Sequence, residues 1–129
     1  MEREIVITRE PIDAVLGSNR IQADGRDGAW LDFYGIVRDT EPDGTPLHGI
    51  DYEAHETMAE HQLHLILDRV GSRHPISRVV LVHRIGLVPA GEASLLVRIL
   101  SPHRQEALTA CAEIIDELKQ DVPIWKHPR

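Results

Sequence analysis

The chain has 129 residues, of which 42% are apolar, and its formal net charge is −7. This length and apolar content predict one compact domain over residues 1–129 with a core of its own. The negative charge argues against general nucleic-acid binding, and no apolar stretch is long enough to span a membrane. Cys111 is the single cysteine, which excludes an intrachain disulfide. The charged N-terminus lacks a signal-peptide core, so we expect a cytoplasmic protein.

The first half of the chain predicts three strands and one short helix. Residues 4–8 alternate between polar and apolar and predict a strand. Pro11 suits the first turn of a short helix that ends near Gly17. Residues 29–37 are rich in aromatic and β-branched side chains and predict a second strand. A polar loop separates it from a third strand, expected over residues 49–54.

The second half begins with a long helix over residues 55–70, whose apolar side chains recur at helical spacing. Gly71 is expected to end this helix. Two strands follow at residues 76–85 and 93–100, and residues 86–91 connect them. Because these strands are apolar throughout and do not alternate, we expect a sheet to bury them on both faces.

A second long helix begins after Ser101, a favourable N-cap residue, with Pro102 at the first helical position. Its apolar stripe includes Cys111, which we interpret as a core residue and not as a nucleophile. The helix should end before Pro123, because a residue that precedes proline avoids helical geometry. Strands and helices in this order predict the α+β class, with an antiparallel or mixed sheet and two long helices.

His103 and Arg104 are cations in the first turn of this last helix, where the free N–H groups and the helix dipole favour acidic residues. An anion bound beside them would explain their presence. The alternative is two solvated side chains at a small energetic cost. Arg38 ends a predicted strand beside a polar loop, where its planar guanidinium could grip a phosphate. A surface ion pair is the ordinary alternative for this arginine.

Lys119 and Lys126 are the only two lysines. Lys119 follows Cys111 and Ile115 at steps of four residues, so it should border the buried face of the helix. Partial desolvation there would lower the lysine pKa and free an amine for proton transfer or nucleophilic attack. Lys126 follows a proline and a tryptophan that could hold it in place. Ordinary readings compete with both, namely a snorkelling cation for Lys119 and a frayed basic tail for Lys126.

The eight histidines raise the question of a metal site. His55 begins a segment like the zinc motif HExxH, but Ala59 occupies the position of the second ligand. His61 and His64 share one helix face without an obvious further ligand. We therefore expect no metal, and a metal-dependent hydrolase that uses the histidines remains an alternative hypothesis.

Several short motifs are more informative together than any residue alone. They are FYGIVR at 33–38, YEA at 52–54 with MA at 58–59, HRIG at 83–86, SPHR at 101–104, LK at 118–119 and PIWK at 123–126. In this order and spacing they resemble the large, catalytic subunit of molybdopterin synthase, the MoaE family. The resemblance covers nearly the whole chain, and the SPHR and PIWK motifs are its most specific parts.

The resemblance implies an α/β-hammerhead fold and a homodimer. Each chain of the dimer would bind one small ubiquitin-like sulfur-carrier subunit, which gives a heterotetramer. The carrier's C-terminal Gly-Gly thiocarboxylate would enter a pocket of this chain. The implied substrate is cyclic pyranopterin monophosphate, which receives two sulfurs and becomes the dithiolene of molybdopterin. No cofactor is implied for this reaction.

The resemblance also implies roles for the matching residues. Arg38, His103 and Arg104 would hold the phosphate and the pterin of the substrate. Lys119 would act near the thiocarboxylate, as a proton donor and acceptor or as a transient covalent partner. Lys126 would stabilise the negative charge that develops as the sulfur attacks and the cyclic phosphate opens. The expected site residues are Ile36, Val37, Arg38, His103, Arg104, Lys119, Lys126, His127 and Pro128.

The C-terminal end departs from the family pattern. The family usually has a basic residue and then glutamate after its second lysine, whereas this chain has His127 and Pro128. The family also commonly continues further, whereas this sequence stops at Arg129. A second hypothesis is therefore a shortened, non-catalytic paralogue that only binds the carrier or an anionic ligand.

Overall fold

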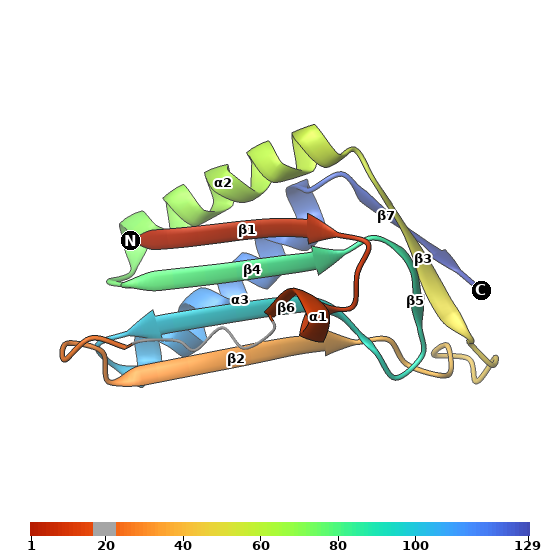
Figure 1. Cartoon of the computed structure of the whole chain (residues 1–129), viewed down its shortest axis with the longest axis horizontal. Coiled ribbons are helices and arrows are strands. Elements are labelled where there is room, and N and C mark those ends of the chain that lie inside the picture. Colours follow the sequence, from red (N-terminus) through yellow and green to blue (C-terminus); the bar gives the residue numbers. More distant parts are fainter. Residues whose placement is uncertain (17–22) are drawn as a thin grey trace.

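The computed structural model describes residues 1–16 and 23–129, and a four-stranded mixed sheet forms its body (Figure 1). In this large sheet the strand order is β1–β4–β6–β2. β1 runs parallel to β4, and the other neighbours are antiparallel. The strands are β1 (Glu2–Thr8), β2 (Ala29–Ile36), β4 (Arg78–Arg84) and β6 (Ala93–Ser101).

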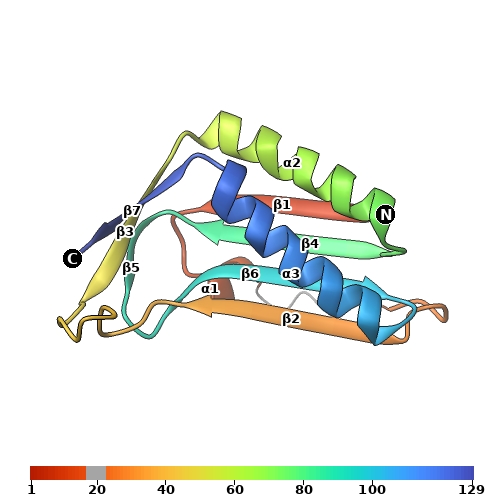
Figure 2. The same ribbon diagram turned by 180° about the vertical axis from the view of Figure 1, so that it is seen from behind.

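A three-stranded small sheet lies across one end of the large sheet (Figures 1 and 2). Its antiparallel order is β5–β3–β7, with β3 in the middle. The strands are β3 (Gly49–Ala54), β5 (Gly86–Pro89) and β7 (Ile124–Pro128). Segments far apart in the sequence therefore meet at this end of the molecule.

Two long helices, α2 (Glu56–Arg73) and α3 (Arg104–Asp121), lie side by side on one face of the large sheet (Figure 2). The short helix α1 (Ile12–Leu16) lies on the opposite face (Figure 1). This arrangement confirms the predicted α+β class, with a mixed sheet and two long helices. Gly17, where the short helix was expected to end, is outside the described residues.

The main core lies between the large sheet and the two long helices. Its helical part consists of Ala59, Leu63, Ile66, Leu67, Val70, Ala107, Ala110, Cys111, Ile114 and Leu118. Val79, Leu81, Val97 and Ile99 face these helices from β4 and β6. Val80, Val82 and Leu96 point to the other side, where they pack with Ile12 of α1. The two central strands are thus buried on both faces, as their apolar sequences predicted.

The start of α3 differs from the prediction. Ser101 is the last residue of β6 and is paired with Ala29, so it cannot be the N-cap residue. Its hydroxyl donates to the carbonyl oxygen of His103 at 2.6 Å. His103 is the N-cap residue, and the helix begins at Arg104, two positions beyond the expected Pro102. The strong N-cap preference of serine was overridden by the length of the strand that precedes it.

The predicted end of α2 at Gly71 is also wrong, because the helix continues to Arg73 and His74 is its C-cap residue. A Cβ atom at position 71 would come within 3.1 Å of the Met1 side chain. The glycine therefore makes room for the N-terminus and does not end the helix. The start was predicted within one residue, since His55 is the N-cap residue and its Nδ1 accepts from the Met58 amide.

The remaining two differences concern short strands. The sequence predicts only a connection over residues 86–91, and for residues 123–126 it allows either a segment held in place or a frayed basic tail. The first contains β5 and the second opens into β7, which pairs with β3 from Ile124 to Pro128. Both are short and flanked by proline or glycine, so their sequences are typical of turns.

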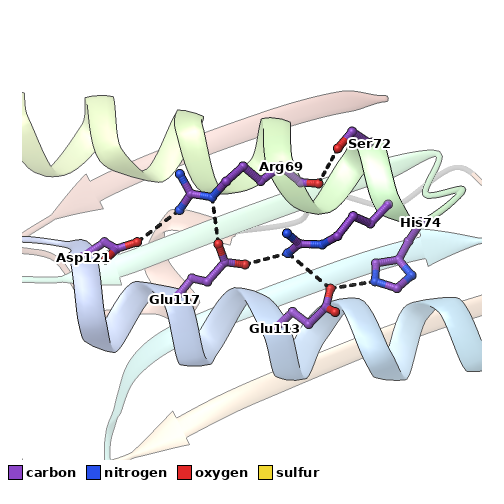
Figure 3. A network of polar contacts seen from close by, with 7 residues as sticks. Arg69, Ser72, His74, Glu113, Glu117 and Asp121 are labelled. Atoms are coloured by element: carbon purple, nitrogen blue, oxygen red, sulfur yellow. Dashed lines mark hydrogen bonds and ion pairs between the residues drawn. The ribbon is translucent and has the colours of Figure 1, made fainter.

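Charged side chains clamp α2 to α3 on the surface away from the sheet (Figure 3). Arg69 donates to Glu117 at 2.8 Å and to Asp121 at 3.1 Å. Arg73 donates to Glu117 at 2.8 Å. His74 contacts Glu113 at 2.6 Å. The two arginines and His74 lie at or near the end of α2 and all the acids lie on α3, so the clamp fixes the two helices side by side.

Candidate active site

A small hollow of about 220 Å³ lies where the end of β2 meets the small sheet. Among the residues that the structure describes, five of the expected site residues line it together. These are Ile36, Val37, Arg38, Lys126 and Pro128. Tyr52, Ile50 and Leu47 complete the apolar part of the wall, and Glu41 adds one acid. The hollow therefore combines two cations with an apolar floor.

Arg38 reaches this hollow because the residue before it is firmly held. Val37 is 3% exposed and packs in a second apolar cluster with Tyr52, Ile85 and Val88. Its amide donates to the carbonyl of Glu92 at 3.0 Å, and its carbonyl accepts from Gly91 at 2.8 Å. Arg38 itself is exposed, so its guanidinium is free to meet a ligand from solvent.

Lys126 reaches the hollow through the register of β7. Lys126 lies opposite Tyr52 of β3, and Pro128 lies opposite Ile50. Because side chains alternate along a strand, Lys126 and Pro128 share the inner face. His127 points to the outer face, where its Nε2 lies 2.9 Å from the Glu53 carboxylate. Of the two residues expected to follow Lys126 in the site, only Pro128 lines the hollow.

Buried polar residues support the floor behind Lys126. The Tyr52 hydroxyl donates to Ser94 Oγ at 3.2 Å, and its ring meets the edge of His83 with centroids 5.4 Å apart. His83 Nδ1 lies 2.8 Å from the Arg84 carbonyl oxygen, which can only accept a proton, so this nitrogen carries the hydrogen. Burial lowers the pKa of His83 to about 4; the Arg84 carbonyl opposes this and the charge of Lys126 adds to it. The imidazole is therefore neutral near pH 7.

His103 and Arg104 lie elsewhere, at the start of α3, and line a separate hollow of about 450 Å³ with Gly28, Pro102 and Gln105. The His103 side chain makes no capping hydrogen bond, so α3 presents this imidazole and the Arg104 guanidinium beside free N–H groups. A side chain at Gly28 would collide with the carbonyl oxygen of Pro102. The turn before β2 and the start of α3 are thus in direct contact, and this hollow can receive an anion.

One chain does not bring all the expected site residues together. Lys119 lies in the last turn of α3, fifteen positions after Arg104, or about 22 Å along the helix axis. The start of α3 lies at the end of the large sheet opposite the small sheet (Figure 2). Lys119 is exposed, so it does not border the buried stripe as the i+4 spacing suggested. Its neighbour Leu118 occupies the buried position.

The structure adds residues that sequence reasoning did not assign to the site. Tyr52 and His83 were noticed only as parts of motifs, since the pairing of β3 with β7 is needed to place them near Lys126. Cys111 is 5% exposed in the core, as predicted, and burial raises its pKa to about 11. Over residues 1–16 and 23–129, no group of three or more His, Cys, Asp or Glu side chains could hold a metal ion. No helix in that part of the chain is long and apolar enough to cross a membrane.

A family model described as MoaE protein matches residues 7–121. Among curated relatives, the molybdopterin synthase catalytic subunit of Thermoplasma volcanium is 37% identical over 123 residues, which cover 95% of this chain and 88% of the relative. The Nostoc protein of the same name is 42% identical over 104 residues, 80% of this chain and 62% of the relative. The rice protein is 42% identical over 99 residues, so the matched part spans only about half, 51%, of its length.

Solved structures agree in fold. The crystal structure of molybdopterin synthase from Staphylococcus aureus matches with a TM-score of 0.84 and 34% identity, covering 98% of this chain and 89% of that one. A protein–protein complex of subunits 1 and 2 of molybdopterin-converting factor from Helicobacter pylori matches with a TM-score of 0.70 and 20% identity, which bears on the fold alone. It covers 98% of this chain and 83% of that one. With the family model matching most of its length, the chain belongs to the MoaE family.

Proposed function

We propose that this chain is the catalytic subunit of a cytoplasmic molybdopterin synthase. It would transfer sulfur from the thiocarboxylated C-terminus of a small carrier subunit to cyclic pyranopterin monophosphate, and so form the dithiolene of molybdopterin. The observation that carries the proposal is the hollow where Arg38 and Lys126 line one wall. Membership of the MoaE family supports the same reaction.

The hollow suits an anionic substrate and a charge that develops during reaction. Arg38 would grip the phosphate through its planar guanidinium. Lys126 would stabilise the negative charge that forms as the thiocarboxylate sulfur attacks and the cyclic phosphate opens. Ile36, which is exposed, offers apolar contact for the pterin, and the buried Val37 holds this end of β2 in place. Lys119 lies at the nearby end of α3, where it would move a proton. Alternatively, once the sulfur is bonded to the substrate, its amine would attack the carrier's acyl carbon, the carbon–sulfur bond would break to leave the sulfur on the substrate, and water would then release the carrier as a carboxylate.

His103 and Arg104 would join this site from a second copy of the chain. They lie at the far end of α3, so they cannot reach a phosphate that Arg38 of the same chain holds. A two-fold dimer would bring the start of one α3 to the hollow of its partner, and would do so twice. β2 is an edge strand of the large sheet and exposes Trp30, Tyr34 and Ile36, a surface that a second copy could cover.

The carrier subunit would enter from the side of the small sheet. An extended Gly-Gly tail is narrow enough to approach a site of this size, and its thiocarboxylate is an anion that Lys119 and Lys126 would attract. Two carriers on one homodimer make the proposed heterotetramer.

Reconstitution tests the function directly. The purified chain is mixed with a thiocarboxylated carrier and cyclic pyranopterin monophosphate, and molybdopterin is measured. We expect turnover that Lys119→Ala and Lys126→Ala each abolish while carrier binding persists. A chain that binds the carrier and yields no molybdopterin, while a competent catalytic subunit works alongside, would instead support the non-catalytic paralogue.

Mixing two inactive variants tests the shared site. Lys126→Ala and Arg104→Ala homodimers should both be inactive. After subunit exchange, half of the dimers carry one of each chain, and one of their two sites is intact. We expect about a quarter of the wild-type activity to return. Mixing Lys126→Ala with Lys119→Ala is the control, because both defects then lie in the part of the site that one chain supplies. Absence of complementation by Arg104→Ala would refute the shared arrangement.

A further inference from the structure

Arg84, the last residue of β4, is an arginine that the fold keeps almost fully buried. The residue is 8% exposed, and its Nη1 donates to Glu92 Oε1 at 2.9 Å. Its Nε has no hydrogen-bond partner within the described part of the chain. A buried guanidinium loses its hydration, and one ion pair with an unsatisfied nitrogen beside it is a weak source of stability. Stability alone therefore does not explain why the fold buries this ion pair.

Glu92 connects this arginine to the candidate active site. It closes the turn between β5 and β6, where its amide donates to the Pro89 carbonyl at 3.1 Å and Gly91 takes a φ of 88°. Its own carbonyl accepts the Val37 amide at 3.0 Å, and the neighbouring Gly91 amide donates to the Val37 carbonyl at 2.8 Å. The side chain of Glu92 thus contacts β4 while its backbone holds the residue before Arg38.

The ladder between β2 and β6 alone does not fix the position of Arg38. Its register shifts between Gly35 and Ile36, immediately before the hollow. Such an irregularity bends the strand and changes the direction in which its last side chains point. Beyond it, the Val37 backbone pairs with Gly91 and Glu92 of the turn. The exposed Arg38 side chain lines the hollow, and the hydrogen bonds of the Val37 backbone fix the point from which this side chain extends.

We propose that Arg84 and Glu92 are a positioning pair that sets Arg38 for its anionic ligand. The inference rests on the proposed function, because it takes Arg38 to be the residue that binds the substrate phosphate. Arg84 extends from the rigid central strand β4 and fixes the Glu92 side chain. Glu92 then fixes Val37, and Val37 presents Arg38 to the hollow. Neither Arg84 nor Glu92 lines that hollow, so they act through Arg38 and not on the ligand.

A purely stabilising ion pair makes a different prediction. Removing it would lower the free energy of unfolding and leave the kinetics of the folded enzyme unchanged. A positioning pair also raises the KM for cyclic pyranopterin monophosphate, because Arg38 already holds the phosphate in the bound ground state.

Glu92→Gln is the main test, since the Glu92 side chain is about half exposed and the variant should fold. Asp68→Asn is the matched control, because it removes the carboxylate of another arginine pair, with Arg3 at 2.7 Å, near the opposite end of the large sheet. We expect Glu92→Gln to raise KM about tenfold, and Asp68→Asn to leave KM unchanged at a similar loss of thermal stability. Arg38→Ala removes the guanidinium itself and should give the largest rise in KM, about a hundredfold.

A second readout needs no turnover. Inorganic phosphate is titrated into each variant by calorimetry, and both Arg38→Ala and Glu92→Gln should weaken its binding. Arg84→Met should behave like Glu92→Gln, and Arg84→Lys, which keeps a cation against Glu92, should restore most of the affinity.

The outcomes separate this inference from the proposed function. If Arg38→Ala weakens phosphate binding and raises KM while Glu92→Gln does neither, the positioning pair is refuted and the function stands. If Arg38→Ala itself has no effect on either quantity, both the role of the hollow and the positioning pair are refuted. An equal rise of KM in Asp68→Asn would show that any loss of stability has this effect, and would also overturn the inference.

Discussion

The large sheet and the small sheet are held together in different ways. The large sheet is covered by two long helices, and its core joins side chains from every strand to both helices. The small sheet joins residues 49–54, 86–89 and 124–128 mainly through backbone ladders around β3. Its apolar cluster is much smaller and includes Val37, Tyr52 and Val88.

The same contrast holds for charge. In the helix layer formed by α2 and α3, the described ion pairs join the two helices, as between Arg69 and Glu117. At the small sheet Arg38 and Lys126 face a hollow. The lining of this hollow has two basic residues and one acid, Glu41, so a bound anion would meet a surplus of positive charge there. Substitutions should therefore separate into those that change folding and those that change the site.

The largest effect on folding is expected at Ile114, which is fully buried between α3 and the large sheet. Ile114→Ala removes apolar contacts and leaves a cavity, so the free energy of unfolding should fall by about 2–5 kcal/mol. Leu108→Ala is the control, because Leu108 lies on the same helix and is 55% exposed. Leu108→Ala should change the free energy of unfolding by less than about 0.5 kcal/mol. Urea denaturation measures both.

If both variants lose a similar amount of free energy of unfolding, burial against the large sheet does not determine the stability of α3. The proposed difference between the two sheets would then be wrong. If Leu108→Ala alone is destabilising, a partner must cover that exposed face of α3. Repeating the denaturation at several protein concentrations would detect such a partner if it is a second copy.

His83 lies at the border of the two sheets and should make folding depend on pH. Its pKa is about 4 in the folded chain and near 6.5 when it is solvated. Below pH 6.5 the unfolded chain therefore binds a proton that the folded chain does not, and stability falls until the pH reaches about 4. The full loss amounts to about 3 kcal/mol.

Urea denaturation of wild type and His83→Gln between pH 7.5 and 4 tests this linkage. The wild-type free energy of unfolding should fall more steeply with decreasing pH than that of the variant, starting near pH 6.5. Parallel curves would mean that His83 titrates normally and that the border between the sheets is open to water.

The helix layer is the part of the fold that the sequence predicted well. The stripe through Cys111, Ile114 and Leu118 repeats at helical spacing, and the continuous apolar run at Val79–Val82 indicated a strand buried on both faces. These patterns are local, so one sequence is enough to read them. The errors arose where two local signals competed, as at Ser101, where the strand continues past a good N-cap residue.

The small sheet could not be predicted in the same way. Placing Lys126 in the hollow requires the pairing of β7 with β3, and its partner Tyr52 is 74 residues earlier in the sequence. No local pattern encodes this register, and Pro123 and Pro128 make the segment resemble a loop. The motifs marked the candidate site residues, but the fold is needed to show that Lys126 and Arg38 line one hollow while Arg104 lines another.

The clamp between α2 and α3 should contribute a smaller, pH-dependent stability (Figure 3). Burial of Glu117 would raise its pKa, but hydrogen bonds from Arg69 and Arg73 outweigh this and lower it below the usual 4.5. The contribution is therefore present above pH 4.5 and is lost as the pH falls through the lower folded value. Glu117→Gln should cost about 1 kcal/mol at pH 7, and the difference from wild type should shrink at pH 3.

The exposed Glu60, on α2, provides the control for this clamp, and Glu60→Gln should leave stability unchanged at both values of pH. If the cost of Glu117→Gln is the same at pH 3 as at pH 7, charge is not what joins the two helices. The helix layer would then depend on apolar packing alone, which would sharpen its contrast with the small sheet.

The smallest effect is expected at Cys111, whose thiol should be unreactive while the chain is folded. Burial in the helix layer raises its pKa to about 11, so at pH 8 almost none of it is the nucleophilic thiolate. Iodoacetamide at pH 8 should leave the native chain unmodified by mass spectrometry and alkylate it in 8 M urea. If the layer of α2 and α3 opens only with global unfolding, the alkylation rate of the native chain should rise in Ile114→Ala and stay near the wild-type value in Leu108→Ala, which hardly changes stability. Rapid alkylation of the wild type would instead place local opening in α3 itself, and the two regions would no longer be separate in stability.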